Sequence, residues 1–271
     1  MVALQDGKPM LPLPSDYVPI PAARRLTNAD LQAALAEGWD DFKAEPAYGV
    51  LFGVIYALLG LGGVAFLGQM EWQPLIFPAL TGFMLFGPFA ALGLYDISRR
   101  QQRGRPVEAK RVFFAFRRHG GSQIGMLGLF LVFATIAWLK IATLIYALYF
   151  GPAPMPIDHL YAAVIADGHG LRFAATGMLA GAVIASVIFT FSVFAAPMLL
   201  DRDVDVVTAM IASYRAVMMN VRLMFAWAAM VAVVIGFSVM AGLLGLVVTL
   251  PLLGHATWHL YVRTFGEDTA D

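Results

Sequence analysis

Long apolar segments alternate with short polar connections along the chain from residue 48 onwards. About 20 apolar residues in a helix cross the hydrocarbon of a bilayer, and six segments approach or reach that length. The last two are separated at Gly242, because one helix across both would be about twice as long as a crossing requires. The pattern predicts an all-α, polytopic membrane protein with six transmembrane helices. The predicted spans are residues 48–67, 75–95, 123–149, 172–200, 223–241 and 243–262.

Three shorter segments, each ahead of an outgoing span, carry apolar residues at the three- and four-residue spacing of one helix face. The first begins at Thr27 and Asp30, whose spacing is that of a capping box. The second begins near Glu108 and the third near Asp205, so each has an acid at its positive end. These segments are too short and too polar to cross, and we expect three amphipathic interfacial helices. Their apolar positions are Leu31, Ala34, Leu35, Gly38, Trp39 and Phe42; Ala109, Val112, Phe113 and Phe116; and Val207, Met210, Ile211, Tyr214, Val217 and Met218.

The order of these elements indicates a threefold internal repeat of interfacial helix, outgoing span and returning span. The interfacial segments align without a gap, and each returning span contains a proline, at Pro88, Pro197 and Pro251. The alternative, that any six-helix protein with basic connections would align as well, stays open. The predicted repeat units are about residues 27–100, 105–201 and 203–263.

The composition supports a membrane protein. Hydrophobic residues make up 60% of the chain and charged residues 13%, whereas soluble domains have roughly 45–50% and 25%. The formal net charge of zero gives no sign of a nucleic-acid partner. The absence of cysteine excludes disulfides, thiolate metal sites and cysteine nucleophiles.

The distribution of charge predicts the orientation. With the six predicted spans, 16 of the 18 lysines and arginines lie on one side of the membrane, so the positive-inside rule places both termini in the cytoplasm. We expect a single membrane domain over residues 27–263, between a proline-rich, disordered tail over 1–26 and a short tail over 264–271. Eight of the basic residues lie in the connection 99–118, where we expect contact with anionic lipid headgroups.

Two histidines are candidate ligands. His255 and His259 are four residues apart on one helix face, a spacing that can place two imidazoles on a metal or a haem edge. No acid lies between them as in a zinc-protease helix, and no thiolate is available. The favoured interpretation is two imidazoles in the interface, in an aromatic belt or bonded to Asp96 or Asp201, with haem or metal binding as the alternative.

Three further groups could have a function. Asp201, Arg202 and Asp203 could bind a cation, although a helix-capping cluster with an internal arginine pair is the favoured interpretation. Lys140 is a charge inside a predicted span, and such charges are often functional. We expect its long side chain to reach outward to the interface instead. No catalytic constellation and no dedicated metal site is predicted.

Four stretches together resemble a known bacterial integral-membrane family, catalogued as domain of unknown function 2189. They are RRLTNADLQAALAEGWDDF, GPFAALGLYDISRR, PMLLDRDVDVVTAM and LPLLGHATWHLY, and the resemblance covers about residues 24–263. It implies a location in the bacterial cytoplasmic (inner) membrane and supplies no established activity. Members are sometimes labelled cytochrome c oxidase subunits, but only His255 and His259 lie in a predicted span here, too few for an oxidase core.

We therefore expect a non-enzymatic accessory, assembly or lipid-interacting partner of membrane complexes, including respiratory complexes. Its expected partners are membrane lipids and other integral membrane proteins. One alternative is a small-solute or ion transporter or channel, which the proline-containing spans and Lys140 would suit. A second is a redox protein with haem or metal at His255 and His259. A polar cavity that reaches Lys140 would favour transport, and an apolar interior would favour the accessory role.

Overall fold

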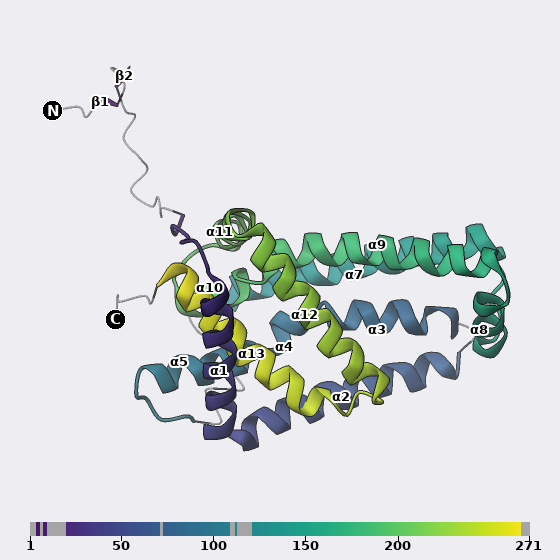
Figure 1. Cartoon of the computed structure of the whole chain (residues 1–271), viewed down its shortest axis with the longest axis horizontal. Coiled ribbons are helices and arrows are strands. Elements are labelled where there is room, and N and C mark those ends of the chain that lie inside the picture. Colours follow the sequence, from purple (N-terminus) through teal and green to yellow (C-terminus); the bar gives the residue numbers. More distant parts are fainter. Residues whose placement is uncertain are drawn as a thin grey trace.

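The computed structural model describes residues 4–5, 8–9, 20–70, 73–108, 112 and 121–266. Over this part of the chain the structure is helical, apart from the short antiparallel pair β1 (Leu4–Gln5) and β2 (Lys8–Pro9) (Figure 1). The predicted all-α class is confirmed. Most of the predicted disordered tail lies outside the described residues, but its last residues are fixed: the backbone N–H of Leu26 donates to Asn220 Oδ1 at 2.7 Å.

Four helices are long and apolar enough to cross a membrane among the described residues. They agree with the first, third, fourth and fifth predicted spans. The prediction of a multi-pass helical membrane protein is thereby confirmed. These helices are α2 (Pro46–Gly68), α7 (Gly121–Phe150), α9 (Gly168–Ser192) with its continuation α10 (Ala195–Asp201), and α12 (Val221–Met240).

The second predicted span is a broken helix, which does not qualify as a candidate span. A proline ring has no N–H and clashes with the preceding turn, and the chain turns at residues 85–86, just before Pro88. A second turn follows at Ala91. The pieces are the 3-10 turn η1 (Gln73–Leu75), α3 (Ile76–Met84), α4 (Gly87–Ala90) and α5 (Leu92–Gln102).

The sixth predicted span is α13 (Leu246–Phe265), a continuous helix of 20 residues with Pro251 inside it. Its polar residues make it less apolar than the four candidate spans, and it is not one of them. Residues 241–245 form the turn before it, as the prediction of a turn at Gly242 required, and Gly242 has a positive φ of 67°.

Two of the three predicted interfacial segments are helices, α1 (Asn28–Ala44) and α11 (Val206–Met219). Thr27 and Asp30 form the predicted capping box at α1, and the Asp205 carboxylate accepts the backbone N–H of Thr208 at the start of α11. The second segment falls mostly on residues 109–111 and 113–120, outside the described part. A short helix that the pattern did not predict, α8 (Ile157–Ala166), lies in the connection between α7 and α9.

The buried core gathers at the end of the molecule where α1 packs against α13 (Figure 1). There α1, α5, α10 and α13 meet, and the runs 92–98, 192–201 and 253–261 are buried without interruption. Away from this end, α2, α7, α9 and α12 expose large apolar side chains, as helices in contact with hydrocarbon would. The fold thus has a closely packed end and apolar lateral surfaces.

Helix α1 turns its apolar face to the protein and not to lipid, which corrects its interpretation as a helix with that face on the membrane. Ala34, Gly38 and Phe42 are buried. A Cβ atom on Gly38 would lie 2.5 Å from the backbone nitrogen of Ala256, so α1 and α13 approach each other almost backbone to backbone. A glycine at this position permits the contact.

Candidate functional site

Six polar side chains from three helices form what we call the histidine cluster, at the closely packed end. Helices α1, α5 and α13 each contribute two of them, one turn apart, so both members of a pair point to the same side. The cluster consists of Glu37 and Asp41 from α1, Ser98 and Gln102 from α5, and His255 and His259 from α13.

His255 is completely buried. Its Nδ1 lies 2.7 Å from Ser98 Oγ and 4.0 Å from Asp41 Oδ2. Its Nε2 has no hydrogen-bond partner among the described residues. The serine and the carboxylate therefore lie at the same ring nitrogen, whereas a hydrolytic triad needs them at opposite nitrogens.

His259 is bonded through both ring nitrogens. Nε2 lies 2.7 Å from Asp41 Oδ2, and Nδ1 lies 3.2 Å from Gln102 Nε2. The indole N–H of Trp258 can only donate, and it donates to Gln102 Oε1 at 2.8 Å, which turns the amide nitrogen of Gln102 toward His259. In this arrangement His259 Nδ1 accepts from Gln102, and Nε2–H donates to Asp41.

The same Nδ1 also lies 3.1 Å from Glu37 Oε2. A carboxylate can pair with this nitrogen only when the nitrogen carries a proton, and Gln102 can donate to it only when it does not. Gln102 and Glu37 are thus alternative partners for two protonation states of His259. Burial raises the pKa of Asp41, but hydrogen bonds from His259 and Ser98 outweigh it, and the pKa lies below its ordinary value.

The sequence interpretation offered Asp96 or Asp201 as the partner of the histidines, but neither aspartate bonds to them in the structure. Their carboxylate is Asp41, which stands 218 positions before His259 in the sequence. It reaches them because α1 packs across α13. The donor set fits a metal or haem poorly, since such a group would have to displace Asp41 or Gln102 from His259. The described residues contain no group of three or more histidines and acids that could hold a metal ion.

Asp201 is the centre of a second group, the aspartate cluster, which joins α10 to α5 and α13. Arg99 Nε lies 2.9 Å and Arg103 Nη2 3.4 Å from Asp201 Oδ1, and the Tyr261 hydroxyl donates to Oδ2 at 3.0 Å. Arg202 donates to the Tyr261 hydroxyl oxygen at 3.0 Å. Asp201 thus pairs with arginines of another helix and not with its neighbour Arg202, which corrects the predicted internal pair.

Asp203 is exposed in the connection between α10 and α11, and the helix cap is Asp205. Asp96 lies on α5, where its Oδ2 accepts from Arg100 Nε at 2.6 Å, and both side chains are buried. Arg99, Arg100 and Arg103 therefore make internal ion pairs. This part of the basic connection 99–118, where the sequence predicted contact with lipid headgroups, binds the protein's own acids.

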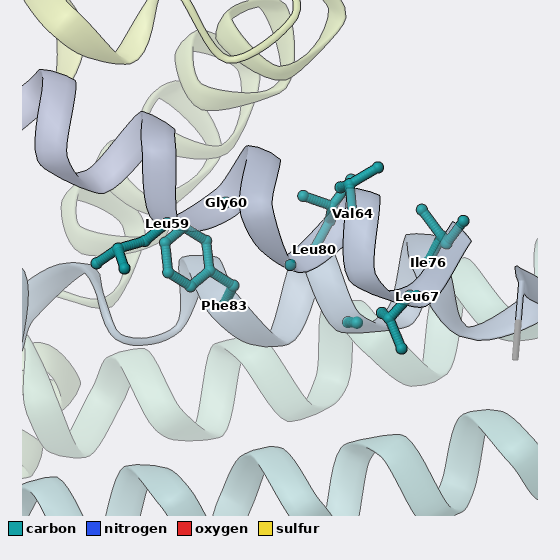
Figure 2. A pocket seen from close by; sticks show the side chains of 9 residues that line it. Leu59, Gly60, Val64, Leu67, Ile76, Leu80 and Phe83 are labelled. Atoms are coloured by element: carbon teal, nitrogen blue, oxygen red, sulfur yellow. The ribbon is translucent and has the colours of Figure 1, made fainter. Parts of the chain in front are cut away.

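Lys140 belongs to neither cluster. It is exposed on α7, on the same face as Met126, Leu129 and Phe133. A groove of about 80 Å³ lies between α2 and α3, and Lys140 is not part of its lining. Figure 2 shows the side chains that line it. Every lining residue is apolar: Leu59, Gly60, Gly63, Val64, Leu67, Ile76, Ala79, Leu80 and Phe83.

The sequence reasoning missed Glu37, Asp41, Ser98 and Gln102. Asp41 is not among the apolar positions predicted for α1, and its contact with α13 is not local in the sequence. One signal was available: the small residues Ala34 and Gly38 stand four apart on α1, the spacing that lets another helix come close. The side chain of Asp41, one turn beyond Gly38 on the same face, could therefore reach that neighbouring helix, α13.

A comparison with family models matches residues 76–201 to the family described as "Predicted integral membrane protein (DUF2189)". The matched range is narrower than the resemblance over 24–263, and the stretches around α1 and α13 lie outside it. Comparisons with curated proteins and with solved structures find no match for the chain. Over residues 76–201 the chain is therefore similar to the family of predicted integral membrane proteins known as domain of unknown function 2189.

Proposed function

We propose that this chain is a non-enzymatic accessory protein of the bacterial inner membrane, which acts through lateral contacts with integral membrane proteins and lipids. The observation that carries the proposal is the exposed face of α7, which we call the α7 stripe. Its members follow one another at three- and four-residue spacing with Lys140 in the series, as in the seam of packed helices. The stripe consists of Met126, Leu129, Phe133, Ile136, Lys140, Leu144 and Leu148.

The acids of the two clusters already have partners within the protein, which supports the same proposal. Asp201 pairs with two arginines and accepts a hydrogen bond from a tyrosine hydroxyl, and Asp41 accepts hydrogen bonds from His259 and Ser98. These groups join helices to one another and are largely buried. The ionisable side chains of both clusters thus hold the helices together. Many large side chains exposed on the candidate spans are apolar, although the charged residues Lys140, Arg172 and Arg222 are exposed there too.

We also propose that the broken helix and α13 complete six crossings. At 1.5 Å per residue α13 would extend over about 30 Å, enough for the hydrocarbon, and the broken helix would cross through its successive pieces α3, α4 and α5. An even number of crossings puts both ends of the helical part on one side, and the backbone N–H of Arg24 donates to the Thr264 carbonyl at 2.9 Å, so these two residues lie together. The positive-inside rule assigns that side to the cytoplasm.

A threefold repeat would fit this arrangement. Helices α1 and α11 both start at an acid-containing cap, and α5, α10 and α13 all bring polar groups to the closely packed end. Reporter fusions test the six crossings. A reporter that is active only in the cytoplasm should be active when it is fused after Gly104. A fusion point on the outer side would refute both the orientation and the proposed repeat.

Site-specific photo-crosslinking in intact cells tests the accessory role. A photoreactive phenylalanine analogue at Phe133, which is exposed on the α7 stripe, should form a discrete adduct with another integral membrane protein. The control is Leu131 on the same helix, which is completely buried and should form none. If positions along the stripe give lipid adducts alone, the protein-partner part of the proposal is refuted.

A transporter is the second candidate, because discontinuous helices are common at transport sites. Here α3–α5 and α9–α10 are interrupted. However, protein groups bind the carbonyls at the breaks: the Tyr56 hydroxyl donates to the Phe83 carbonyl, and the Ser213 hydroxyl to the Thr190 carbonyl. Solute flux in proteoliposomes, together with an unsuccessful crosslink at Phe133, would favour the transporter over the accessory protein.

A further inference from the structure

Helix α11 has a buried face of small residues and an exposed face of large apolar ones. Ala209, Ala212 and Ala216 are completely buried, so this face lies directly on the neighbouring helices. On the other side, large residues follow at positions i, i+4, i+7 and i+11, which places them on one line along the helix. This α11 stripe consists of Val207, Ile211, Tyr214 and Met218, with exposed fractions of 58%, 36%, 43% and 41%.

The direction of α11 differs from that of the candidate spans. Figure 1 shows α11 nearly end-on, whereas α7 and α9 run along the long axis of the molecule. If those spans cross the membrane, α11 lies roughly in the membrane plane. It does so at the closely packed end of the molecule.

The α11 stripe is continuous with the lateral surface of α9. The ring of Tyr214 stacks on Phe191, with 5.6 Å between the centroids and 16° between the planes. Phe191 belongs to a column of α9 residues at four-residue spacing, in which Val183 and Val187 are exposed. Since these valines face the hydrocarbon when α9 crosses the bilayer, the stripe meets the bilayer at its interface.

Two arginines flank the stripe. Arg215 follows Tyr214 on α11, and Arg222 is the second residue of α12, just after the turn at Asn220 that ends α11. Both are exposed, and neither makes an ion pair with another described residue. The nearest acids in the sequence, Asp203 and Asp205, stand at the opposite end of α11, and Asp205 is bonded to Thr208.

We propose that α11 docks on a bilayer surface rich in anionic phospholipid. The stripe enters the boundary between headgroups and acyl chains, and the guanidinium groups of Arg215 and Arg222 bind lipid phosphates. A guanidinium matches a phosphate with two parallel hydrogen bonds, and apolar side chains beside cationic ones are typical of interfacial helices. The proposal deepens the membrane role by naming the lipid class, and its tests do not depend on a protein partner.

The position of the stripe can be measured on the full chain, which has no cysteine, so that a single introduced cysteine carries a spin label. Ile211→Cys is reconstituted in nanodiscs of phosphatidylcholine and phosphatidylglycerol. We expect the label to be accessible to oxygen and protected from a water-soluble nickel chelate, like a label at the lipid-facing Val187→Cys. A label at Asp203→Cys is the aqueous control. If position 211 behaves like position 203, the proposal is refuted.

The lipid class is tested by removing the two charges. Arg215→Gln/Arg222→Gln is compared with Arg25→Gln/Lys43→Gln, which removes two charges near α1, at the same end of the molecule. One arginine at an anionic surface changes affinity by about a factor of five, so the first variant should retain at least about tenfold less phosphatidylglycerol, measured by native mass spectrometry. The control variant should retain it.

Two other outcomes would also overturn the proposal. Equal loss of lipid in both variants would mean that only the total charge matters. Spin–spin broadening at position 211 in nanodiscs would mean that a second copy of the chain covers the stripe. Failure of the photo-crosslink at Phe133 would refute the protein-partner role and leave the lipid surface of α11 intact.

Discussion

The contact between Asp41 and His259 should hold helix α1 on α13, and its free energy can be measured by a double-mutant cycle. Asp41→Ala removes the carboxylate that accepts from His259 Nε2 at 2.7 Å. The change leaves the His259 ring buried, with Gln102 as its remaining neutral partner. We expect the free energy of unfolding to fall because a largely buried polar group loses its partner.

The structure sets the size of the effect. Removing one partner of a buried ion pair costs about 3–5 kcal/mol, but Asp41 is 14% exposed and His259 keeps Gln102, so we expect about 2–3 kcal/mol. Asp41→Asn keeps an acceptor for Nε2–H and should lose only about 1 kcal/mol, the net worth of a hydrogen bond. Asp40→Ala is the matched control, because Asp40 is 70% exposed and should change stability by less than about 0.5 kcal/mol.

The assay is equilibrium unfolding in mixed micelles, followed by the fluorescence of tryptophans such as Trp258, which contacts the cluster through Gln102. Asp41→Ala, His259→Ala and the double variant form the cycle, and we expect a coupling energy of about 1–2 kcal/mol, within the range for residues in contact. Additive effects, with a coupling below about 0.3 kcal/mol, would refute the contact as a stabilising one.

The same pair predicts a pH dependence. The pKa of Asp41 is lower in the folded protein than its ordinary value. A group with a lowered folded pKa contributes stability that is fully present above its unfolded pKa, about 3.9, and lost as the pH falls through the folded pKa. The wild type should therefore lose stability more steeply than Asp41→Asn below about pH 4. Parallel curves for the two proteins would contradict this assignment.

Three further substitutions test the junction of helices. Asp201→Asn leaves two arginines, among them Arg99, without their carboxylate, and should cost about 2–4 kcal/mol in micelle unfolding; no change would mean that solvent screens this pair. Gly38→Leu places a Cβ 2.5 Å from the Ala256 nitrogen and should release α1, seen as faster hydrogen exchange in α1 alone. Asp205→Ala removes the cap of α11 and should cost about 1 kcal/mol, with faster exchange in the first turn of α11.

Features that depend on local sequence were predictable. The apolar length of a helix and the acid at its start are local, so the four candidate spans and the caps at Asp30 and Asp205 follow from the sequence. The turn near Pro88 has the same local origin, although the proline did not reveal where the helix would resume. These features need no knowledge of what packs against them.

Features that depend on contacts between distant segments were not predictable. An apolar stripe predicts that one helix face contacts an apolar surface, but it does not distinguish a lipid surface from a protein surface. The stripe of α1 covers α13, whereas four of the six predicted positions on α11 face outward. Likewise, Asp41 looked like a surface acid because its partner His259 is more than 200 residues away.

The difference between the closely packed end and the apolar lateral surfaces explains where the polar groups lie. Within hydrocarbon a charged side chain needs a partner from the protein, since lipid offers none. Asp201, His259 and Arg100 lie on three different helices, and each bonds to a group on a neighbouring helix or loop. Such bonds fix the helices relative to one another at one end, whereas isolated contacts, such as the indole N–H of Trp138 to the Pro78 carbonyl at 2.8 Å, join the helices away from it. Substitutions at this end should therefore change stability and lateral contacts together, whereas substitutions on the α7 stripe should change the contacts alone.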